Sequence, residues 1–348
     1  MKKLILIALA AVLAACGQSP KGSGREKLAG AGATFPLPYY NLAFKTYRDS
    51  VPAEVSYGGI GSGGGIRSLK DRIVDFAGSD AYLTDAEMAA MPDSVIHIPT
   101  CMGAVVMAYN LPGVEKLKLT GELVADIYLG KITRWNDARI RGINPGVQLP
   151  DLEIHPVYRS DGSGTTVVFS DYLTKVSPAW KETIGAGKSL EWPAGLAAKG
   201  NPGISGTVSQ TEGAVGYIGS EYAFAQHISY ASLQNKAGRF IDPTLESISA
   251  AAAGDLPTDT RCMITDPDAA DAYPISCFTW ILLYKEQGYD KRTREQSEAL
   301  VDLLGWMLGS QAQDLAGKVN YAPLPQQVIN NGRAQLGTVT YKGEKLLK

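Results

Sequence analysis

The sequence is poor in histidine, cysteine and net charge, and each shortage excludes a class of function. Only three histidines and four cysteines occur among 348 residues. Cysteine and histidine with the spacing of a zinc site are absent, so no metal is predicted. The 33 basic and 35 acidic side chains leave a net charge of −2, which gives no positive field for nucleic acid. We therefore expect no metal, no cofactor and no nucleic-acid partner.

The residues needed for hydrolytic catalysis are also scarce. Only His97, His155 and His227 could act as an imidazole base. No Gly-x-Ser-x-Gly elbow surrounds Ser62 or Ser163, and no Gly-Lys-Ser/Thr sequence ends either glycine-rich stretch, so neither an activated serine nor a Walker loop is indicated. We predict that the protein is not an enzyme and has no catalytic residue.

The apolar run at the N-terminus is too short to cross a membrane. It extends from Leu4 to Ala15 after two lysines, which is the layout of a secretory signal. The sequence LAAC that ends at Cys16 matches a bacterial lipoprotein cleavage box, although an ordinary signal peptide ending near a cysteine is the alternative. We expect residues 1–15 to be a signal peptide and residues 16–27 to be the lipidated Cys16 and a flexible tether. The protein would then be periplasmic and lipid-anchored to a membrane.

Three cysteines remain after Cys16 in a chain that is expected to leave the cytoplasm. Cys262 and Cys277 flank a segment rich in Pro and Asp, so we expect a disulfide that closes this segment. Cys101 lies in an apolar run and is expected to be a buried free thiol.

Short apolar runs alternate with amphipathic segments through the chain, which predicts an α/β fold. A helix is expected to carry Tyr40, Phe44 and Tyr47 on one face because their spacing is helical. Strands are predicted at 28–31, 54–57, 75–79, 104–109 and 276–284, helices at 65–71 and 293–309, and helix starts at 120–128 and 210–212. The loops that follow the predicted strands are rich in Gly, Ser and Thr.

The glycine-rich stretch YGGIGSGGGIRS, residues 57–68, has two readings. It contains Gly59-x-Gly61-x-x-Gly64, and Asp80 lies near the distance at which a dinucleotide-binding fold places its ribose-binding acid. Export from the cytoplasm, where nicotinamide cofactors circulate, weakens that reading. A second loop of similar composition, SDGSGTT, also lies about a hundred residues further on. The glycine pattern alone does not decide between a cofactor and another anion.

Three loops together say more than one. The loops 33–35, 61–63 and 161–165 each place a hydroxyl beside backbone N–H groups at a predicted helix start. Helix N-termini bind anions through free N–H donors and the local dipole, although a plain N-cap is the alternative for each hydroxyl. If the three loops converge, they would surround a small oxyanion.

Seven segments carry a resemblance to a known family, in order and over nearly the whole mature chain. They are GAGATFP, YGGIGSGGG, FAGSDAYL, DIYLGKITRWND, RSDGSGTTVVF, GAVGYIG and YPISCFTWILLY. Together they resemble the periplasmic phosphate-binding proteins of bacterial phosphate ABC importers. The resemblance implies a type II periplasmic-binding-protein-like fold, with lobe I formed by 28–105 plus 279–348 and lobe II by 106–278. Phosphate would lie in the cleft between two α/β lobes joined by a hinge, and the partners would be membrane permease and ATPase subunits.

The resemblance also implies a set of phosphate-binding residues. They are Thr34, Phe35, Ser62, Asp80, Arg159, Ser163, Gly164 and Thr165. Asp161 is expected to support the site by pairing with Arg159, or alternatively to form a turn within SDGSG. A receptor for another tetrahedral oxyanion, such as sulfate, molybdate or arsenate, remains the alternative function.

Asp80 is the unusual member of this set because a carboxylate can only accept hydrogen bonds. It therefore needs a ligand oxygen that still carries hydrogen, which phosphate supplies and sulfate does not. Two unpaired acceptors facing each other would reject sulfate more strongly than size could. The alternative for Asp80 is a helix N-cap before Thr84.

Overall fold

The computed structural model describes residues 26–51 and 53–347. The predicted signal peptide and Cys16 lie outside the described residues. The strands are β1 (Glu26–Gly32), β2 (Ala53–Gly59), β3 (Phe76–Ser79), β4 (Val95–Tyr109), β5 (Leu117–Leu119), β6 (His155–Arg159), β7 (Leu196–Ala198), β8 (Ala214–Gly219), β9 (Ala231–Gln234), β10 (Phe240–Ile241), β11 (Ser276–Tyr284), β12 (Thr340–Tyr341) and β13 (Glu344–Lys345). The helices are α1 (Leu37–Ser50), α2 (Ser62–Lys70), α3 (Asp85–Ala89), α4 (Gly121–Tyr128), α5 (Ala138–Ile143), α6 (Gly164–Val176), α7 (Pro178–Thr183), α8 (Gly200–Gln210), α9 (Ser220–Ala225), α10 (Leu245–Ala250), α11 (Arg294–Met307), α12 (Ser310–Lys318) and α13 (Gln326–Leu336).

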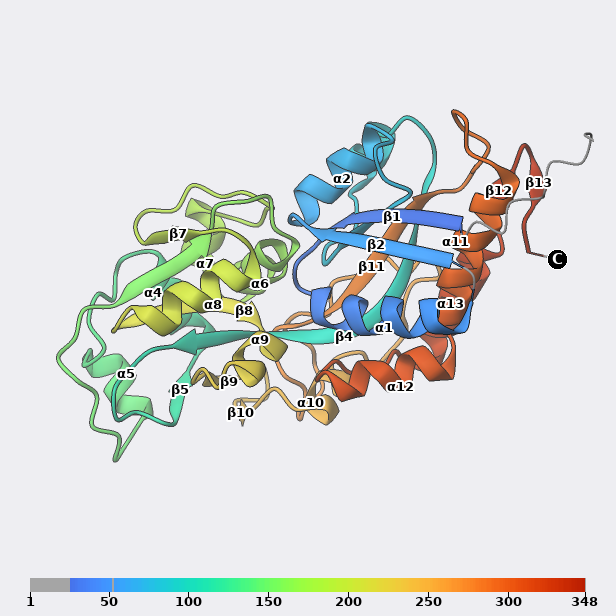
Figure 1. Ribbon diagram of the computed structural model, residues 1–348. Coiled ribbons are helices and arrows are strands. Elements are labelled where there is room, and N and C mark those ends of the chain that lie inside the picture. Colours follow the sequence, from blue (N-terminus) through green and yellow to red (C-terminus); the bar gives the residue numbers. More distant parts are fainter. Residues whose placement is uncertain (1–25, 52, 348) are drawn as a thin grey trace, which may run out of the picture.

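One long strand, β4, joins two α/β halves (Figure 1). The eight-stranded sheet has the order β2-β1-β3-β11-β4-β8-β6-β7. Residues 95–104 of β4 pair with β11, and residues 105–109 pair with β8. Every residue of β4 is buried, because the strand is covered on both faces. The mixed α/β architecture with two halves confirms the fold class predicted from the sequence.

Helices cover the sheet in each half, and α1 illustrates why. Its buried residues recur at helical spacing on one face: Tyr39, Tyr40, Ala43, Phe44 and Tyr47. This apolar stripe packs α1 against β2 and α12. The helix predicted from Tyr40, Phe44 and Tyr47 is therefore confirmed. In the other half α8 packs on β8 and β6, and α6 packs on β8.

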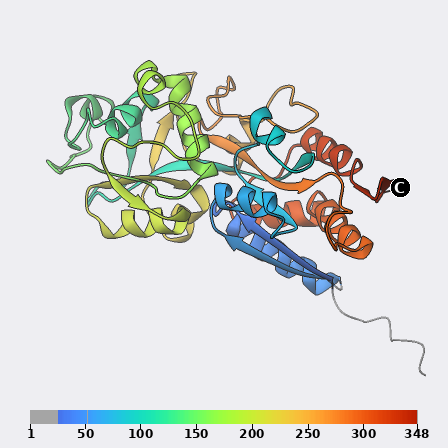
Figure 2. The same ribbon diagram turned by 90° about the horizontal axis from the view of Figure 1, so that it is seen from above.

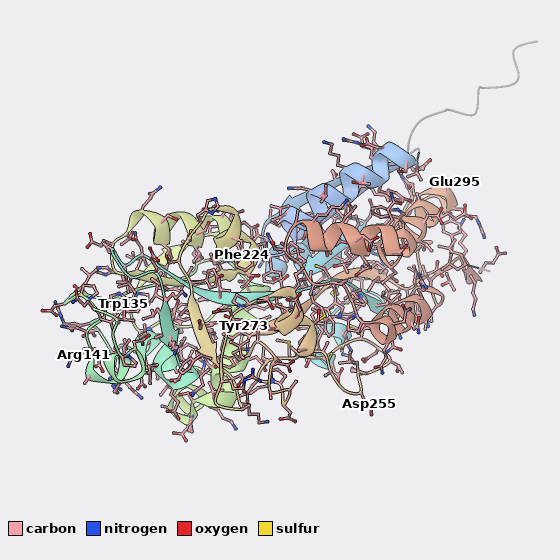
Figure 3. All side chains as sticks on the ribbon, turned by 90° about the horizontal axis from the view of Figure 1, so that it is seen from below. Trp135, Arg141, Phe224, Asp255, Tyr273 and Glu295 are labelled. Carbon is pink, nitrogen blue, oxygen red and sulfur yellow. The ribbon has the colours of Figure 1, made fainter. Side chains whose placement is uncertain are left out.

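The chain crosses between the halves a second time before β11. Tyr273, in the segment that leads into β11, donates a hydrogen bond to the carbonyl oxygen of Val105, at 3.2 Å. Figure 3 labels Tyr273 near the middle of the molecule. We propose that the lobe boundary lies where the pairing of β4 changes, next to the predicted boundary at 105/106. Because β11 begins at Ser276, we propose that the second crossing lies slightly before the predicted 278/279.

Glu26 starts β1, so the first strand includes the last residues of the predicted tether. The start of β1 and the hairpin of β12 and β13 lie on the same half of the molecule (Figures 1 and 2). Across residues 26–51 and 53–347, no helix combines the length and the apolar character needed to cross a membrane.

Most predicted elements are present, but the helix start predicted at 210–212 is wrong. Gln210 is the last residue of α8, and the following residues form a turn. The sequence of α8, GNPGISGTVSQ, has little helix propensity or apolar periodicity. Its Ile204 and Val208 are nevertheless buried against Gly216 of β8, where an added Cβ would meet both side chains within 2.8 Å. Tertiary packing therefore forms a helix that local sequence does not predict.

The disulfide expected between Cys262 and Cys277 is not formed, since both thiols are free. The segment between them closes on itself, because the amide of Asp266 donates to the carbonyl oxygen of Pro274 at 2.8 Å. Cys262 lies outside that loop, whereas Cys277 is buried in β11 opposite Gly103. Burial raises the pKa of the Cys262 thiol to about 11, which disfavours the reactive thiolate. Cys101 is a buried free thiol, as predicted.

Candidate anion-binding site

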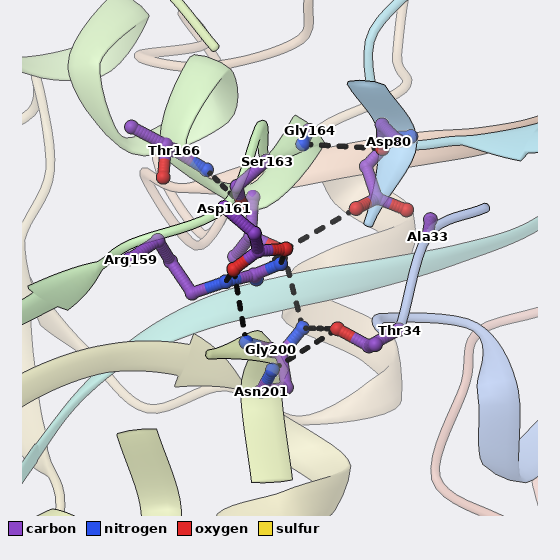
Figure 4. Close-up of polar contacts among 12 residues, drawn as sticks. Ala33, Thr34, Asp80, Arg159, Asp161, Ser163, Gly164, Thr166, Gly200 and Asn201 are labelled. Atoms are coloured by element: carbon purple, nitrogen blue, oxygen red, sulfur yellow. Dashed lines mark hydrogen bonds and ion pairs between the residues drawn. The ribbon is translucent and has the colours of Figure 1, made fainter. Parts of the chain in front are cut away.

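Predicted site residues from both halves meet at the junction (Figure 4). Thr34 and Phe35 follow β1, Ser62 opens α2, and Asp80 follows β3. From the other half, Arg159 ends β6 and the segment 163–165 opens α6. All eight predicted residues are buried, which is unusual for so many polar groups. The expected convergence of three loops at helix starts is confirmed.

Hydrogen bonds join the two halves directly at this site. The Gly164 amide donates to the hydroxyl of Ser62 at 3.1 Å. The hydroxyl of Thr165 donates to Asp80 Oδ2 at 3.3 Å. The amide of Asn201 donates to Thr34 Oγ1 at 3.0 Å. The halves are thus closed on each other around these groups.

Asp80 is a buried acceptor, with 1% of its surface exposed. Its Oδ1 accepts from the Thr279 hydroxyl at 3.1 Å, and its Oδ2 accepts from Thr165. Burial raises the pKa of Asp80 to about 7, against the opposing effects of the Thr279 hydrogen bond and the Arg159 charge. The alternative role as a helix cap is wrong, because Thr84 itself caps α3 in a capping box.

Arg159, which is buried, and Asp161, which is partly buried, form a bidentate pair. Arg159 Nε lies 2.7 Å from Asp161 Oδ1, and Nη2 lies 2.6 Å from Oδ2. The Gly200 amide also donates to Oδ1 at 2.9 Å. Although burial acts to raise it, these hydrogen bonds hold the pKa of Asp161 below its usual value. The predicted pairing is confirmed, and it fixes the plane of the guanidinium so that Nη1 points towards Thr165 at 3.5 Å.

The remaining predicted residues contribute in different ways. Ser163 caps α6 by accepting from the Thr166 amide at 3.0 Å, so the N-cap alternative holds for this serine. Ser62 Oγ accepts from Gly164 and, at 3.5 Å, from the amide of Asp80. Phe35 is buried against the ring of Tyr321, whose hydroxyl donates to the Phe35 carbonyl oxygen at 2.5 Å. This contact fixes the main chain that carries the Phe35 amide.

Glycines let the two halves approach closely. The Gly63 amide donates to the carbonyl oxygen of Gly162 at 2.8 Å. Gly61 has a φ of +85°, and a Cβ there would lie 2.3 Å from Asp161 Oδ2. The glycine-rich stretch therefore serves close approach between lobes, which explains its composition without a dinucleotide.

A second contact between the halves lies beside the site. Lys188 Nζ pairs with Glu87 Oε1 at 2.5 Å, and the Lys188 carbonyl oxygen accepts from the Ser163 amide at 2.9 Å. The ion pair borders a cavity of about 490 Å³ that residues of both halves line. The pair thus links closure of the halves to the first turn of α6.

Sequence reasoning missed Asn201 and Thr279. Thr279 is a polar residue inside the apolar run SCFTWILLY, and this was the available signal for it. Asn201 opens α8, a helix that the sequence did not predict. If α8 had been predicted, Asn201 would have been recognised as a fourth polar residue at a helix start.

One of the three histidines that a hydrolase could use, His97, has a structural role. His97 is buried in β4, and its Nε2 accepts from the Leu83 amide at 3.0 Å. Burial lowers the pKa of His97 to about 3. A neutral histidine whose acceptor nitrogen is occupied cannot serve as a general base.

Two α/β halves joined at β4, with donors from both halves around the buried carboxylate of Asp80 at their junction, define a substrate-binding protein of the periplasmic-binding-protein class. The family profile described as the PBP superfamily domain matches residues 17–311. The chain is 40% identical over 308 residues to the phosphate-binding protein PstS of Xylella fastidiosa, covering 87% of this chain and 83% of that relative. It is 39% identical to PstS of Pasteurella multocida, covering 90% of each. The chain belongs to the PstS family of phosphate-binding proteins.

Solved structures agree on the fold. A high-affinity periplasmic phosphate-binding protein bound with phosphate aligns with a TM-score of 0.72 at 21% identity, covering 88% of this chain and 93% of that one. A phosphate-binding protein from Stenotrophomonas maltophilia aligns with a TM-score of 0.69 at 21% identity, with the same coverage. The family consists of binding proteins, which confirms the prediction that this chain is not an enzyme.

Proposed function

We propose that the protein binds inorganic phosphate between its two lobes and delivers it to the permease and ATPase subunits of a phosphate ABC importer. The observation that carries this proposal is the position of Asp80, a buried acceptor surrounded by donors from both lobes. The proposed donors are the hydroxyls of Thr34, Ser62, Ser163 and Thr165, the amides of Phe35 and Gly164, and the guanidinium of Arg159.

The chemistry of this set favours phosphate over sulfate. Hydrogen-bond donors alone cannot distinguish the two anions, because both anions present oxygens in a tetrahedral arrangement. Near neutral pH phosphate still carries a proton that it can donate to Asp80, whereas sulfate would face the carboxylate with a bare oxygen. An unpaired, buried acceptor costs about 1–3 kcal/mol, and more when it is charged. Arsenate has the proton chemistry of phosphate and is expected to compete with it.

The delivery step rests on the relatives, which are named as phosphate-binding proteins, and on a solved phosphate transport receptor from Vibrio cholerae that aligns with a TM-score of 0.56. The finer proposal is that the protein is periplasmic and anchored through lipid at Cys16. The LAAC sequence after an apolar run supports it.

Calorimetry of the chain that begins after Cys16 tests the ligand. Phosphate and arsenate are expected to bind, with sulfate and molybdate much weaker at matched ionic strength. A protein that bound sulfate as tightly as phosphate would contradict the proposal and favour the broader oxyanion receptor.

A further inference from the structure

Asn201 makes several hydrogen bonds to hydroxyl groups of the candidate site. It is fully buried at the start of α8. Its Nδ2 donates to Thr34 Oγ1 at 3.1 Å and to Thr165 Oγ1 at 3.2 Å. The backbone N–H of Asn201 donates to Thr34 Oγ1 as well, at 3.0 Å. One residue therefore contacts hydroxyls that belong to opposite lobes.

The orientation of the Asn201 amide is fixed by its third partner. The backbone amide of Gly219, at the end of β8, donates to Asn201 Oδ1 at 3.0 Å. A backbone N–H can only donate, so the atom facing it must be the oxygen. The NH₂ group must consequently face the two threonine hydroxyls.

This orientation determines what the Thr34 hydroxyl can do. A hydroxyl has two acceptor lone pairs and one donor hydrogen. Both lone pairs of Thr34 Oγ1 are taken by N–H groups of Asn201. The hydrogen of Thr34 is the part that remains for another partner, so this hydroxyl can act only as a donor.

Thr165 is constrained in the same way. Its Oγ1 accepts from Asn201 Nδ2 and, at 3.5 Å, from Arg159 Nη1. Its hydrogen goes to Asp80 Oδ2. A hydroxyl that could rotate freely would accept as readily as it donates, and its lone pairs would repel an anion.

We propose that Asn201 is a positioning residue for anion binding: it occupies both lone pairs of Thr34 and one lone pair of Thr165, so that the Thr34 hydroxyl is held as a donor towards a ligand oxygen and the Thr165 hydroxyl as a donor towards Asp80. This inference rests on the proposed function and extends it from the ligand-contacting residues to the group that sets their polarity. Asn201 thus selects an acceptor ligand through the Thr34 hydroxyl, and it supports the Thr165 contact that orients Asp80.

Phosphate titrations of wild type, Asn201→Ala and Asn201→Asp test the inference. Loss of the amide in Asn201→Ala frees the hydroxyls and is expected to weaken phosphate binding about 10-fold. In Asn201→Asp the carboxylate accepts the hydroxyl hydrogens and adds a negative charge, so binding is expected to weaken about 100-fold or more. If Asn201→Asp bound phosphate as tightly as Asn201→Ala, the inference would be overturned.

A double-mutant cycle separates this role from packing. In a Thr34→Val/Thr165→Val background no hydroxyl remains to be oriented, so Asn201→Ala is expected to change phosphate affinity by less than about 3-fold. Thr34→Ser keeps a hydroxyl at position 34, so in that background Asn201→Ala should weaken phosphate binding as much as it does in wild type. The same loss in both backgrounds, with folding intact by thermal unfolding, would mean that Asn201 acts through packing and would overturn the inference.

Asn235→Ala is the matched control for this cycle. Asn235 is also buried and bonds backbone groups through its side chain, but it contacts Arg239, Ala270 and Ala272 instead of the site. Its removal should lower the unfolding temperature and leave phosphate affinity unchanged. If wild type itself fails to bind phosphate, both the proposed function and this inference fail. If wild type binds and the cycle is additive, this inference alone fails.

Discussion

Gly63 and Gly162 touch across the two lobes, with the Gly63 amide 2.8 Å from the Gly162 carbonyl oxygen. Each leaves little room for a side chain: a Cβ on Gly63 would lie 3.2 Å from the Gly162 Cα, and a Cβ on Gly162 would lie 3.3 Å from the Gly63 Cα. Closure of the proposed phosphate trap therefore depends on two bare backbones meeting at its edge.

Gly63→Ala is expected to hinder closure without unfolding either lobe. Overpacking of a tight contact costs about 1–3 kcal/mol, so phosphate affinity should fall by that free energy. Scattering should also detect a smaller decrease in the radius of gyration on adding phosphate. Gly206→Ala in α8 is the control, because a Cβ there meets nothing within 4 Å. Equal effects of the two changes would refute a role for the Gly63 contact.

Asp80→Asn should narrow the discrimination between phosphate and sulfate. The amide can donate as well as accept, so it no longer repels an unprotonated tetrahedral anion. Phosphate binding should survive but weaken by about 1–3 kcal/mol for the lost charge-assisted bond. Competition titrations at matched ionic strength measure both changes.

Asp255→Asn is the control for Asp80 because Asp255 is exposed and distant in sequence from the site (Figure 3). Asp255→Asn should change neither the affinity for phosphate nor the affinity for sulfate. If wild type and Asp80→Asn exclude sulfate equally, selectivity must arise from another group.

Arg159→Lys keeps the positive charge but loses the planar fork that Asp161 holds at 2.7 and 2.6 Å. Phosphate affinity should fall by about 1.5–3 kcal/mol, the range for hydrogen bonds to charged groups. Arg134→Lys is a suitable control, since Arg134 is also paired with an aspartate but is exposed. Calorimetry that found Arg159→Lys indistinguishable from Arg134→Lys would place Arg159 outside the binding step.

Glu221 should make the protein less stable as the pH rises. Neither of its carboxyl oxygens has a hydrogen-bond partner among the described residues, and burial raises its pKa from 4.5 to about 8. The native state therefore keeps a proton that the unfolded chain releases between those values. The stability from the neutral carboxyl is complete below the unfolded pKa and is lost as the pH rises through the native one.

Glu221→Gln should flatten this decline, because an amide does not titrate. The difference in unfolding free energy between pH 5 and pH 8 should shrink by roughly 3–4 kcal/mol. Part of the decline should persist, because burial also raises the pKa of Asp80 to about 7. Exposed Glu295→Gln is the control (Figure 3). Parallel pH profiles for wild type and Glu221→Gln would show that Glu221 titrates normally.

Cys16→Ala should abolish the proposed lipid anchor. The variant is expected to lose lipid labelling and either to accumulate as an unprocessed precursor or to be released from the membrane. One acyl chain gives reversible binding of only about 10⁴ M⁻¹, so stable attachment implies more than one. Normal membrane retention of the variant in cell fractionation would argue for an ordinary signal peptide instead.

Local sequence was a good guide where an element forms by its own pattern. The continuous apolar run at 276–284 is β11 with the predicted bounds, and the spacing of Tyr40, Phe44 and Tyr47 is that of α1. The glycine and hydroxyl loops were predicted at helix starts because strands, turns and caps depend on neighbouring residues. The same reasoning was wrong for Cys262 and Cys277, since proximity in sequence does not determine how an intervening loop closes.

The sequence by itself determined the α/β pattern and the three anion-type loops, because these depend on residue type and short spacing, and its resemblance to the family pointed to Asp80 as an acceptor among donors. Only the tertiary structure decided that Asn201 and Thr279 complete the site. Asn201 bonds Thr34 although the two are 167 residues apart in the sequence, and Thr279 bonds Asp80 across a separation of 199 residues. Whether a hydroxyl has a lone pair or only its hydrogen left for a ligand depends on partners that folding alone brings together, because a hydrogen bond requires its atoms within about 3 Å.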